Sequence, residues 1–253
     1  MGLFLMKLKV VTFNIRNYDD KNGHSIIERA PRLKSILDNI DADVIGLQEC
    51  KNNWEEILSD DYGNKYEVFL VHRGDDESIP ILWKKDKFDC IKKGVFWLSD
   101  TPDEMSKGWD ELYNCYRICM YAVLQDKESN KSFCFMNTHY GFGDRCQTDS
   151  ANLIYNYNKK ITEFPTFITG DFNMTPTSAG YAQITKYYKD ANKCTLNYTG
   201  TTFHNYAPET QDEHIDYCFV DEKIKPLNTV LLDQTFDGKY PSDHYGFYFE
   251  LEI

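Results

Sequence analysis

The sequence predicts a mixed, largely antiparallel α/β sandwich. Short apolar runs rich in β-branched residues outnumber the segments with helical periodicity. Many connections between these runs are shorter than the dozen or so residues that a parallel crossover needs. The chain has 253 residues, of which 42% are hydrophobic and 15% aromatic, so it can fill a substantial core. A purely parallel, doubly wound sheet is therefore not expected.

The elements follow in order along the chain. Residues 25–40 carry apolar side chains at helical spacing, and Asp41-Ala42-Asp43 ends that helix. Thr148 and Asp149 are suited to cap a helix reaching about residue 160, and Pro176 suits the first turn of another over about 177–188. Apolar runs predict strands at residues 8–13, 44–47, 66–71, 79–83, 121–124, 133–136, 165–169, 217–220, 228–232 and 245–251.

Composition limits the organisation and the partners. No Pro/Gly/Ser-rich linker, like-charge run or fixed-period repeat divides the sequence, so we expect one domain over residues 1–253. The net charge of −12 argues against a broad basic surface for nucleic acid but leaves room for a local basic cleft.

The cysteines and the N-terminus indicate the compartment. Eight cysteines show neither CxxC pairs nor zinc spacing, which favours reduced structural thiols, with Cys90, Cys134 and Cys218 in apolar stretches. The apolar run Met1–Met6 is too short for a signal peptide, and no segment is long enough to span a bilayer. A cytoplasmic protein without a membrane partner is expected.

Six sets of polar residues flank the predicted strands. Strand ends are where α/β folds collect ligand-binding groups. Four sets follow strands and two precede them, so they can meet at one edge only if the later strands run antiparallel to the earlier ones. The sets are Asn14, Glu49, His139 and Asp171 with Asn173 after strands, and Asp216 and Asp243 with His244 before strands.

Three of these residues suit a hard metal ion. Glu49 and Asp243 offer carboxylate oxygens and Asn14 a neutral oxygen, which are ligands that Mg²⁺ prefers, with Mn²⁺ as the alternative ion. Mg²⁺ keeps several waters and binds through one or two carboxylates plus substrate phosphate, so a sparse set is enough.

The remaining residues suit phosphate chemistry. Asp171 can take a proton from water while the amide of Asn173 holds a phosphate oxygen. His139 and His244 can donate hydrogen bonds to phosphate, with Glu77 a candidate to orient His139 and Asp216 to orient His244. Each residue alone is more often a turn or surface group. All six sets together favour a catalytic site over chance turn residues.

At these residues the sequence resembles the endonuclease/exonuclease/phosphatase superfamily of nucleases, deadenylases, sphingomyelinases and inositol polyphosphate phosphatases. The matching motifs run in family order from residue 10 to 246. They are Val11-Thr12-Phe13-Asn14-Ile15-Arg16, Asp43-Val44-Ile45-Gly46-Leu47-Gln48-Glu49, Asn137-Thr138-His139, Gly170-Asp171-Phe172-Asn173, His214-Ile215-Asp216-Tyr217 and Ser242-Asp243-His244.

The resemblance implies a four-layer α/β/β/α sandwich of two mixed, mainly antiparallel sheets, with the site at one edge. It places Mg²⁺ on Glu49 with Asn14 and Asp243 close by. It assigns water activation, phosphate binding and leaving-group stabilisation to the remaining residues, with either Asp171 or His244 as the base and Asp171 preferred. The remaining residues are Asp171, Asn173, His139, Asp216 and His244.

One region resembles bacterial members of deadenylase-like type, namely residues 94–102 followed by Gly108-Trp109-Asp110. Arg117 follows, where such members have an arginine that can clamp a phosphate; the alternative is a surface ion pair. Many relatives have an aspartate two residues after the histidine, where this chain has Gly141 in a glycine-containing loop that we expect to be mobile.

The leading functional hypothesis is a Mg²⁺-dependent phosphodiesterase of nuclease type, in which an activated water attacks in line. His72, Arg73, Arg145 and the many tyrosines are candidate contacts to nucleic acid or a nucleotide. The main alternative is a phosphomonoesterase acting on a small phosphorylated compound such as a sugar, inositol or nucleotide. A binding module that lost its chemistry would lack one of the six sets, and none is missing.

Overall fold

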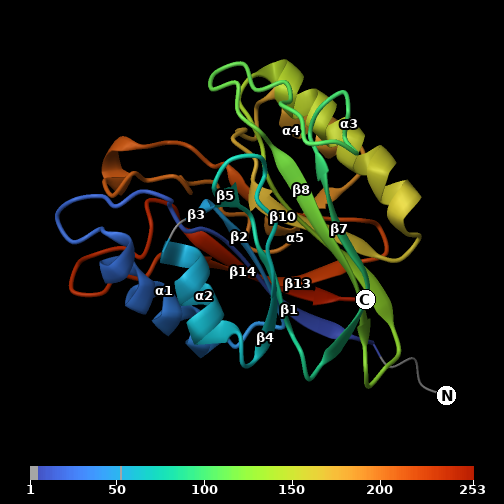
Figure 1. Cartoon of the computed structure of the whole chain (residues 1–253), viewed down its shortest axis with the longest axis horizontal. Helices are drawn as coiled ribbons and strands as arrows, with labels where there is room; N and C mark the ends of the chain where they lie inside the picture. The colour runs from blue at the N-terminus through green and yellow to red at the C-terminus, as the bar shows by residue number, and fades with distance from the viewer. Residues whose placement is uncertain (1–4, 52) are drawn as a thin grey trace.

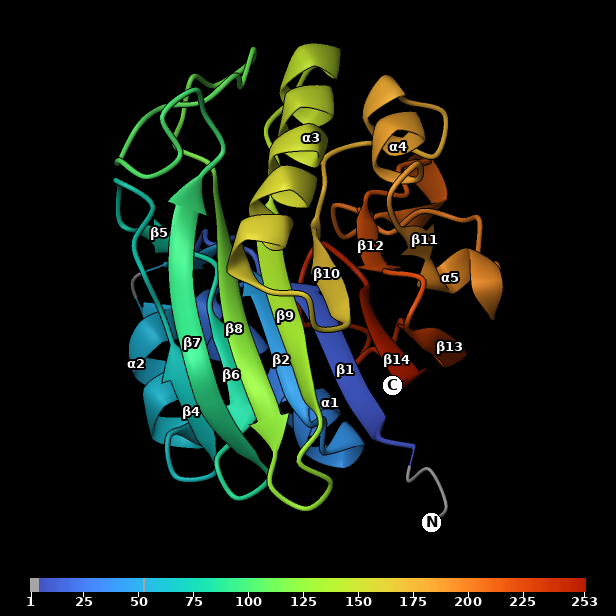
Figure 2. The ribbon, with the colours of Figure 1, turned by 90° about the vertical axis from the view of Figure 1, so that its right-hand side faces the viewer.

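Two six-stranded sheets lie face to face, with helices on their outer faces (Figures 1 and 2). The structure is a computed structural model that describes residues 5–51 and 53–253; the first four residues of the Met1–Met6 run lie outside it. The predicted four-layer α/β/β/α sandwich of two mixed, mainly antiparallel sheets is confirmed.

The first sheet carries α1 (Ile26–Ile40) and α2 (Asn53–Tyr62) on its outer face. Strands β1 and β2 run parallel, and the other neighbours in this sheet run antiparallel. In sheet order its strands are β13 (Lys225–Leu232), β14 (Gly246–Glu252), β1 (Lys7–Asn14), β2 (Val44–Gln48), β6 (Ile81–Lys84) and β4 (Tyr66–Phe69).

The second sheet carries α3 (Asp144–Ile161) and α4 (Ala179–Ile184) outside. Its single parallel pair is β9 with β10. In order its strands are β11 (Lys189–Asp190), β12 (Asp216–Val220), β10 (Thr166–Asp171), β9 (Ser132–His139), β8 (Ile118–Asp126) and β7 (Phe88–Trp97). Shorter elements are β3 (Cys50–Lys51), β5 (Glu77–Ser78), α5 (Ala191–Cys194) and a 3₁₀ turn (Pro208–Thr210).

Both faces of the central strands are buried, because alternate side chains point to opposite faces. Val10 of β1 packs between the two sheets, whereas Val11 packs against α1 and α2. In β8, Met120 faces the other sheet and Tyr121 faces the outer helices. Such strands read as continuous apolar runs, which is why the sequence predicts them well.

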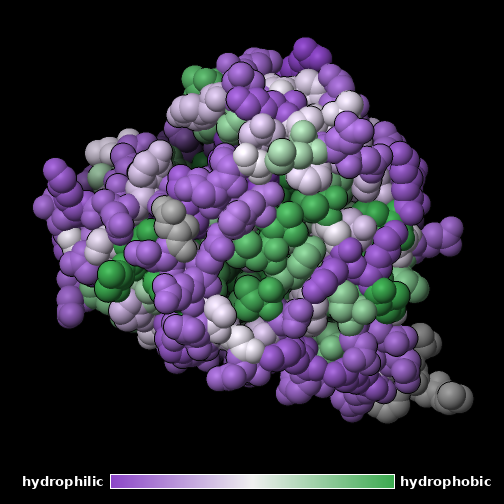
Figure 3. All heavy atoms as spheres, viewed as in Figure 1, coloured by the Kyte–Doolittle hydropathy of each residue, from purple (hydrophilic) through white to green (hydrophobic). Residues whose placement is uncertain are grey.

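The edge strands β4 and β7 lie on the same side of the sandwich, where Lys93 Nζ of β7 lies 3.2 Å from Glu67 Oε1 of β4. Figure 3 shows a strip of apolar side chains there, within an otherwise polar face. The partly buried Phe69, Val95 and Trp97 pack against the core in this region. Within the described residues, no helix is long and apolar enough to cross a membrane.

Strand register brings the polar motifs together. His139 at the end of β9 is the register partner of Asp171 at the end of β10. Asp171 is in turn the partner of Asp216, where antiparallel β12 begins. The C-terminal ends of the parallel strands β9 and β10 and the N-terminal end of the antiparallel strand β12 thus lie at one edge of the sheet. This is the arrangement that the sequence predicted.

Several elements differ from their sequence-based predictions. Helix α2 and the edge strand β7 were not predicted. Helix α3 begins at Asp144, before the expected Thr148-Asp149 cap, because Gly143 adopts a φ of +97° and turns the chain into the helix. Helix α4 ends at Ile184 instead of near residue 188. Cys90 was predicted to be a core thiol but is exposed on β7, whereas Cys134 and Cys218 are buried.

Candidate active site

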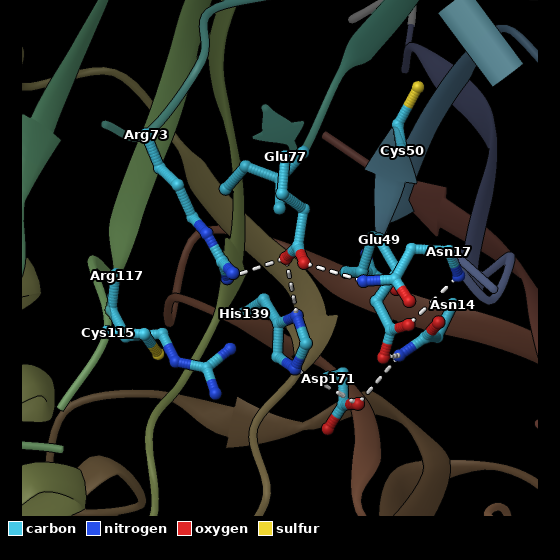
Figure 4. Close-up of polar contacts among 12 residues, drawn as sticks. Asn14, Asn17, Glu49, Cys50, Arg73, Glu77, Cys115, Arg117, His139 and Asp171 are labelled. Carbon is cyan, nitrogen blue, oxygen red and sulfur yellow. Dashed lines mark hydrogen bonds and ion pairs between the residues drawn. The ribbon is translucent and has the colours of Figure 1, made fainter. Parts of the chain in front are cut away.

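The predicted polar residues gather around a cavity of about 500 Å³ at this sheet edge (Figure 4). Asn14 and Asp216 lie directly behind its wall, each hydrogen-bonded to a lining residue. The other candidates all line the cavity: Glu49, Glu77, Arg117, His139, Asp171, Asn173, Asp243 and His244.

Glu49 enters the cavity from the turn after β2. Its φ of +61° is a left-handed conformation that is costly for a non-glycine residue, and such strain concentrates at functional sites. Its Oε1 accepts a hydrogen bond from Asn14 Nδ2 at 3.1 Å, and its Oε2 accepts one from the backbone N–H of Asn17 at 3.0 Å. The carboxylate is therefore held in a single direction.

Three side chains offer ligand atoms that all lie within 4.8 Å of one another: Glu49, Asp171 and His244. Asp243, predicted beside Glu49, lines the same cavity and pairs with Arg16, its Oδ2 lying 3.3 Å from Arg16 Nε. The orientation of Asn14 differs from the expected one. Its Oδ1 accepts from the backbone N–H of Arg16, and its amide nitrogen faces the carboxylates.

Asp171 stands at the centre of the site and is buried. Burial, and next the negative charge of Asp216, raise the pKa of Asp171 to about 7. Its Oδ2 accepts from Asn14 Nδ2 at 2.9 Å, and its Oδ1 accepts from the backbone N–H of Asn173 at 2.9 Å. The Asn173 side chain donates to the carbonyl of Tyr140 at 2.9 Å. A carboxyl with a pKa near neutrality can exchange a proton with water.

His244 and Asp216 form a buried pair, with Nδ1 and Oδ2 2.9 Å apart. Burial alone would lower the pKa of His244, but the charge and hydrogen bond of Asp216 outweigh it and raise the pKa to about 10. The opposite ring nitrogen, Nε2, lies 3.8 Å from Asp171 Oδ2. The imidazolium can therefore donate a charged hydrogen bond into the cavity.

His139 lies between Asp171 and Glu77. Its Nε2 is 3.6 Å from Asp171 Oδ2 and its Nδ1 is 3.6 Å from Glu77 Oε1. Burial, followed by the charge of Arg117, holds the pKa of His139 well below its usual range. Glu77 is itself buried, with Oε1 at 2.6 Å from Arg73 Nη1 and Oε2 at 2.9 Å from Asn17 Nδ2. His139 is thus a neutral imidazole.

Arg117 is not a surface ion pair. Its side chain is 5% exposed, and its Nε donates to Asp110 Oδ2 at 3.1 Å, while the Asp110 side chain is completely buried. Among the described residues, its two terminal nitrogens, Nη1 and Nη2, donate no hydrogen bond. Figure 4 shows this end of the guanidinium directed toward His139 and Asp171. It can therefore bind a phosphate oxygen in the cavity.

Sequence reasoning missed part of the wall. Arg73, proposed only as a general basic contact, lines the cavity, whereas its companion candidates His72 and Arg145 are not lining residues. The rest of the wall comes from side chains in loops, which show no periodic pattern in the sequence: Arg16, Asn17, Tyr18, Tyr113, Cys115, Phe142, Phe203, Glu213 and Ile215.

Comparisons with known proteins agree with this fold. Residues 11–244 match the Endonuclease/Exonuclease/phosphatase family. An endonuclease/exonuclease/phosphatase from Bacteroides vulgatus is 30% identical, with a TM-score of 0.90 over 98% of this chain and 99% of that one. The mannosyl-6-phosphatase Bt3783 of Bacteroides thetaiotaomicron is 28% identical, with a TM-score of 0.88 over 96% and 99%. TDP2 of D. rerio, solved with a single-strand DNA product, is 18% identical and shares the fold, with a TM-score of 0.75 over 98% and 99%.

The fold and the edge site define a hydrolase of phosphoric esters. The chain belongs to the Endonuclease/Exonuclease/phosphatase family, as the sequence predicted. Enzymes of this family typically use a divalent metal ion, and the carboxylate oxygens of Glu49 and Asp171, in the cluster that also includes His244, are donors of the kind that could hold one.

Proposed function

We propose that this protein is a Mg²⁺-dependent phosphomonoesterase that acts on a small phosphorylated compound. The observation that carries the proposal is the placement of Arg117. A buried guanidinium with free terminal nitrogens stands inside a bounded cavity, across from the carboxylate of Glu49. A phosphomonoester dianion has three terminal oxygens and two negative charges. It therefore gains more binding free energy than a diester does from a cation on each side, namely Arg117 and the metal ion.

The metal ion is proposed to bind Glu49, with Asp243 nearby. Hard carboxylate oxygens suit Mg²⁺, with Mn²⁺ as a substitute. Asn14 bridges Glu49 and Asp171 through its amide nitrogen, so we assign it to orienting those carboxylates. When bound, the ion would neutralise phosphate charge and stabilise the leaving oxygen.

Asp171 is proposed to accept the proton of the attacking water. Its pKa of about 7 lies near a neutral working pH, which suits a general base. The backbone N–H of Asn173 holds the other carboxylate oxygen in place. His244, kept charged by Asp216, would donate from Nε2 to a phosphate oxygen, and His139 would contact another.

The limited cavity and the charge of the chain support a small substrate. The volume of about 500 Å³ lies within the range of small-molecule sites. The net charge of −12 disfavours a long polyanion. Similarity to a mannosyl-6-phosphatase over nearly the whole chain points in the same direction.

A phosphodiesterase of nuclease type, possible with the same groups, is the second candidate. Two tyrosines at the cavity favour it, since Tyr18 is 64% exposed and Tyr113 is 65% exposed, and exposed aromatic rings can stack on bases.

The test is phosphate release with Mg²⁺ from hexose phosphates, inositol phosphates and nucleoside monophosphates, compared with cleavage of bis-p-nitrophenyl phosphate, single-stranded DNA and poly(A). Monoesters should be hydrolysed at least tenfold more efficiently, measured as kcat/KM. Faster cleavage of the diesters would favour the second candidate. An inactive Asp171→Asn protein serves as the control for contaminating phosphatases.

A further inference from the structure

Two aromatic side chains form one wall of the cavity beside Arg117. Tyr113 and Phe142 come from separate loops, and their rings meet edge to face with centroids 5.4 Å apart. Both line the cavity together with Arg117 and His139. Tyr113 is largely exposed and Phe142 half-buried, so the pair presents apolar ring surface at the cavity.

The Asp110 carboxylate fixes this pair relative to Arg117. Its Oδ1 accepts from the backbone N–H groups of Leu112 and Tyr113, at 3.0 and 2.9 Å. Its Oδ2 accepts from Arg117 Nε. The two loops are also joined directly, because the Glu111 N–H donates to the Phe142 carbonyl at 3.1 Å. These hydrogen bonds therefore position an exposed pair of rings next to the proposed phosphate-binding cation.

Gly141 makes this arrangement possible. A Cβ at position 141 would lie 2.7 Å from the Cβ and Oδ2 of Asp110, closer than atoms can approach. Any side chain at this position would displace the Asp110 turn and with it Tyr113. The aromatic wall thus depends on a glycine at position 141.

We propose that Tyr113 and Phe142 form the subsite for a ring in the alcohol part of the substrate. The proposal rests on the proposed function and narrows it to phosphate esters of ring-bearing alcohols. A phosphate and its ion fill only part of the cavity, and the remaining space beside Arg117 is bounded by these rings. The apolar face of a sugar or of a base packs well against an aromatic ring, which loses little conformational freedom on binding.

The test compares substrates with and without a ring. Wild type, Tyr113→Ala and Phe142→Ala are assayed with Mg²⁺ on hexose 6-phosphates, AMP and glycerol 3-phosphate. Each substitution should lower kcat/KM for ring-bearing substrates by about 10- to 100-fold, the size of a lost stacking contact. The rate on glycerol 3-phosphate should stay within about twofold, since that substrate lacks the contact. A preference for hexose phosphates identifies the ring as a sugar, and a preference for AMP identifies a nucleoside.

Tyr18→Ala is the matched control, because Tyr18 is an equally exposed tyrosine of the same cavity on another loop. The inference is overturned if Tyr113→Ala and Phe142→Ala lose nothing on ring-bearing substrates, if they lose equally on glycerol 3-phosphate, or if the loss falls on Tyr18→Ala instead. A wild type that hydrolyses no monoester would instead refute the proposed function.

Discussion

The buried Arg29 of α1 holds together the loop that follows β1, and replacing it with methionine should destabilise both the fold and the site. Its guanidinium is fully buried and donates to backbone carbonyls. The acceptors are those of His24 at 2.7 Å, Arg16 at 2.9 Å, Tyr18 at 2.8 Å, Pro241 at 3.5 Å, and Ile15. This loop carries Arg16, Asn17 and Tyr18 into the cavity.

The magnitude follows from what methionine leaves behind. Each hydrogen bond from a charged donor contributes roughly 1.5–3 kcal/mol, and a buried carbonyl left without a partner costs about 1–3 kcal/mol. Burial lowers the pKa of Arg29, which shows that the cation itself is costly to bury, so methionine recovers part of the loss. We expect a net loss of about 3–5 kcal/mol. For a domain of this size that corresponds to a Tm lower by about 6–20 °C.

Thermal and urea unfolding of Arg29→Met measure this loss. The matched control is Arg32→Met, on the same helix, because Arg32 is only half-buried and, within residues 5–51 and 53–253, donates only to the carbonyls of Gly23 and Tyr240. The control should lose no more than about 2 kcal/mol. If Arg29→Met unfolds within 2 °C of the wild type, or no earlier than the control, then the carbonyl bonds do not stabilise the fold as argued.

The remaining predictions concern the site. Saturating Mg²⁺ should raise the wild-type Tm, since an ion at about 100 times its Kd adds about 2.7 kcal/mol to the free energy of unfolding. With Glu49→Gln this rise in Tm should largely disappear, and an unchanged Mg²⁺ titration would exclude Glu49 as the principal ligand. Asp171→Asn should cut kcat by about 10²–10⁴-fold with a cooperative unfolding transition retained, and a wild-type rate would refute its role as base. His244→Ala should remove most activity; full activity would move phosphate binding elsewhere. Arg117→Lys keeps the charge but loses the two parallel N–H donors of the guanidinium, so kcat/KM should fall about tenfold or more, chiefly because KM rises.

The sequence predicted the central strands well and the peripheral elements poorly. Central strands such as β8 are buried on both faces, so hydrophobicity marks them directly. The edge strand β7 has lysines, a glycine and exposed positions through most of its length, so no alternating pattern appears. In α2 the buried Trp54, Leu58 and Tyr62 do follow helical spacing, but the acidic residues around them resemble a loop.

For the site, strand ends could be predicted and loop contacts could not. His139, Asp171 and Asp216 are register partners in adjacent strands, so their proximity follows from the strand order alone. Arg73 and Tyr113 reach the cavity from irregular segments whose course depends on single contacts. The bond from Trp97 Nε1 to the Arg73 carbonyl and the bond from the Tyr113 N–H to Asp110 are such contacts. No periodicity in the sequence encodes them.

Three residues that follow strands at the site have a left-handed backbone conformation. Arg16, Glu49 and Asn173 have φ values of +60°, +61° and +47°, and each lies one or two residues past the end of β1, β2 or β10. A left-handed conformation costs most non-glycine residues about 1–2 kcal/mol, whereas asparagine tolerates it better. Glycine would relieve that strain at Arg16 and Glu49, but it would remove two side chains that line the cavity. Glu49 and Arg16 turn toward the cavity at the point where each strand stops, and the Asn173 N–H fixes Asp171. The three turns therefore direct functional groups from the strand ends toward the cavity. The free energy that they cost is offset by the burial of the central strands on both faces.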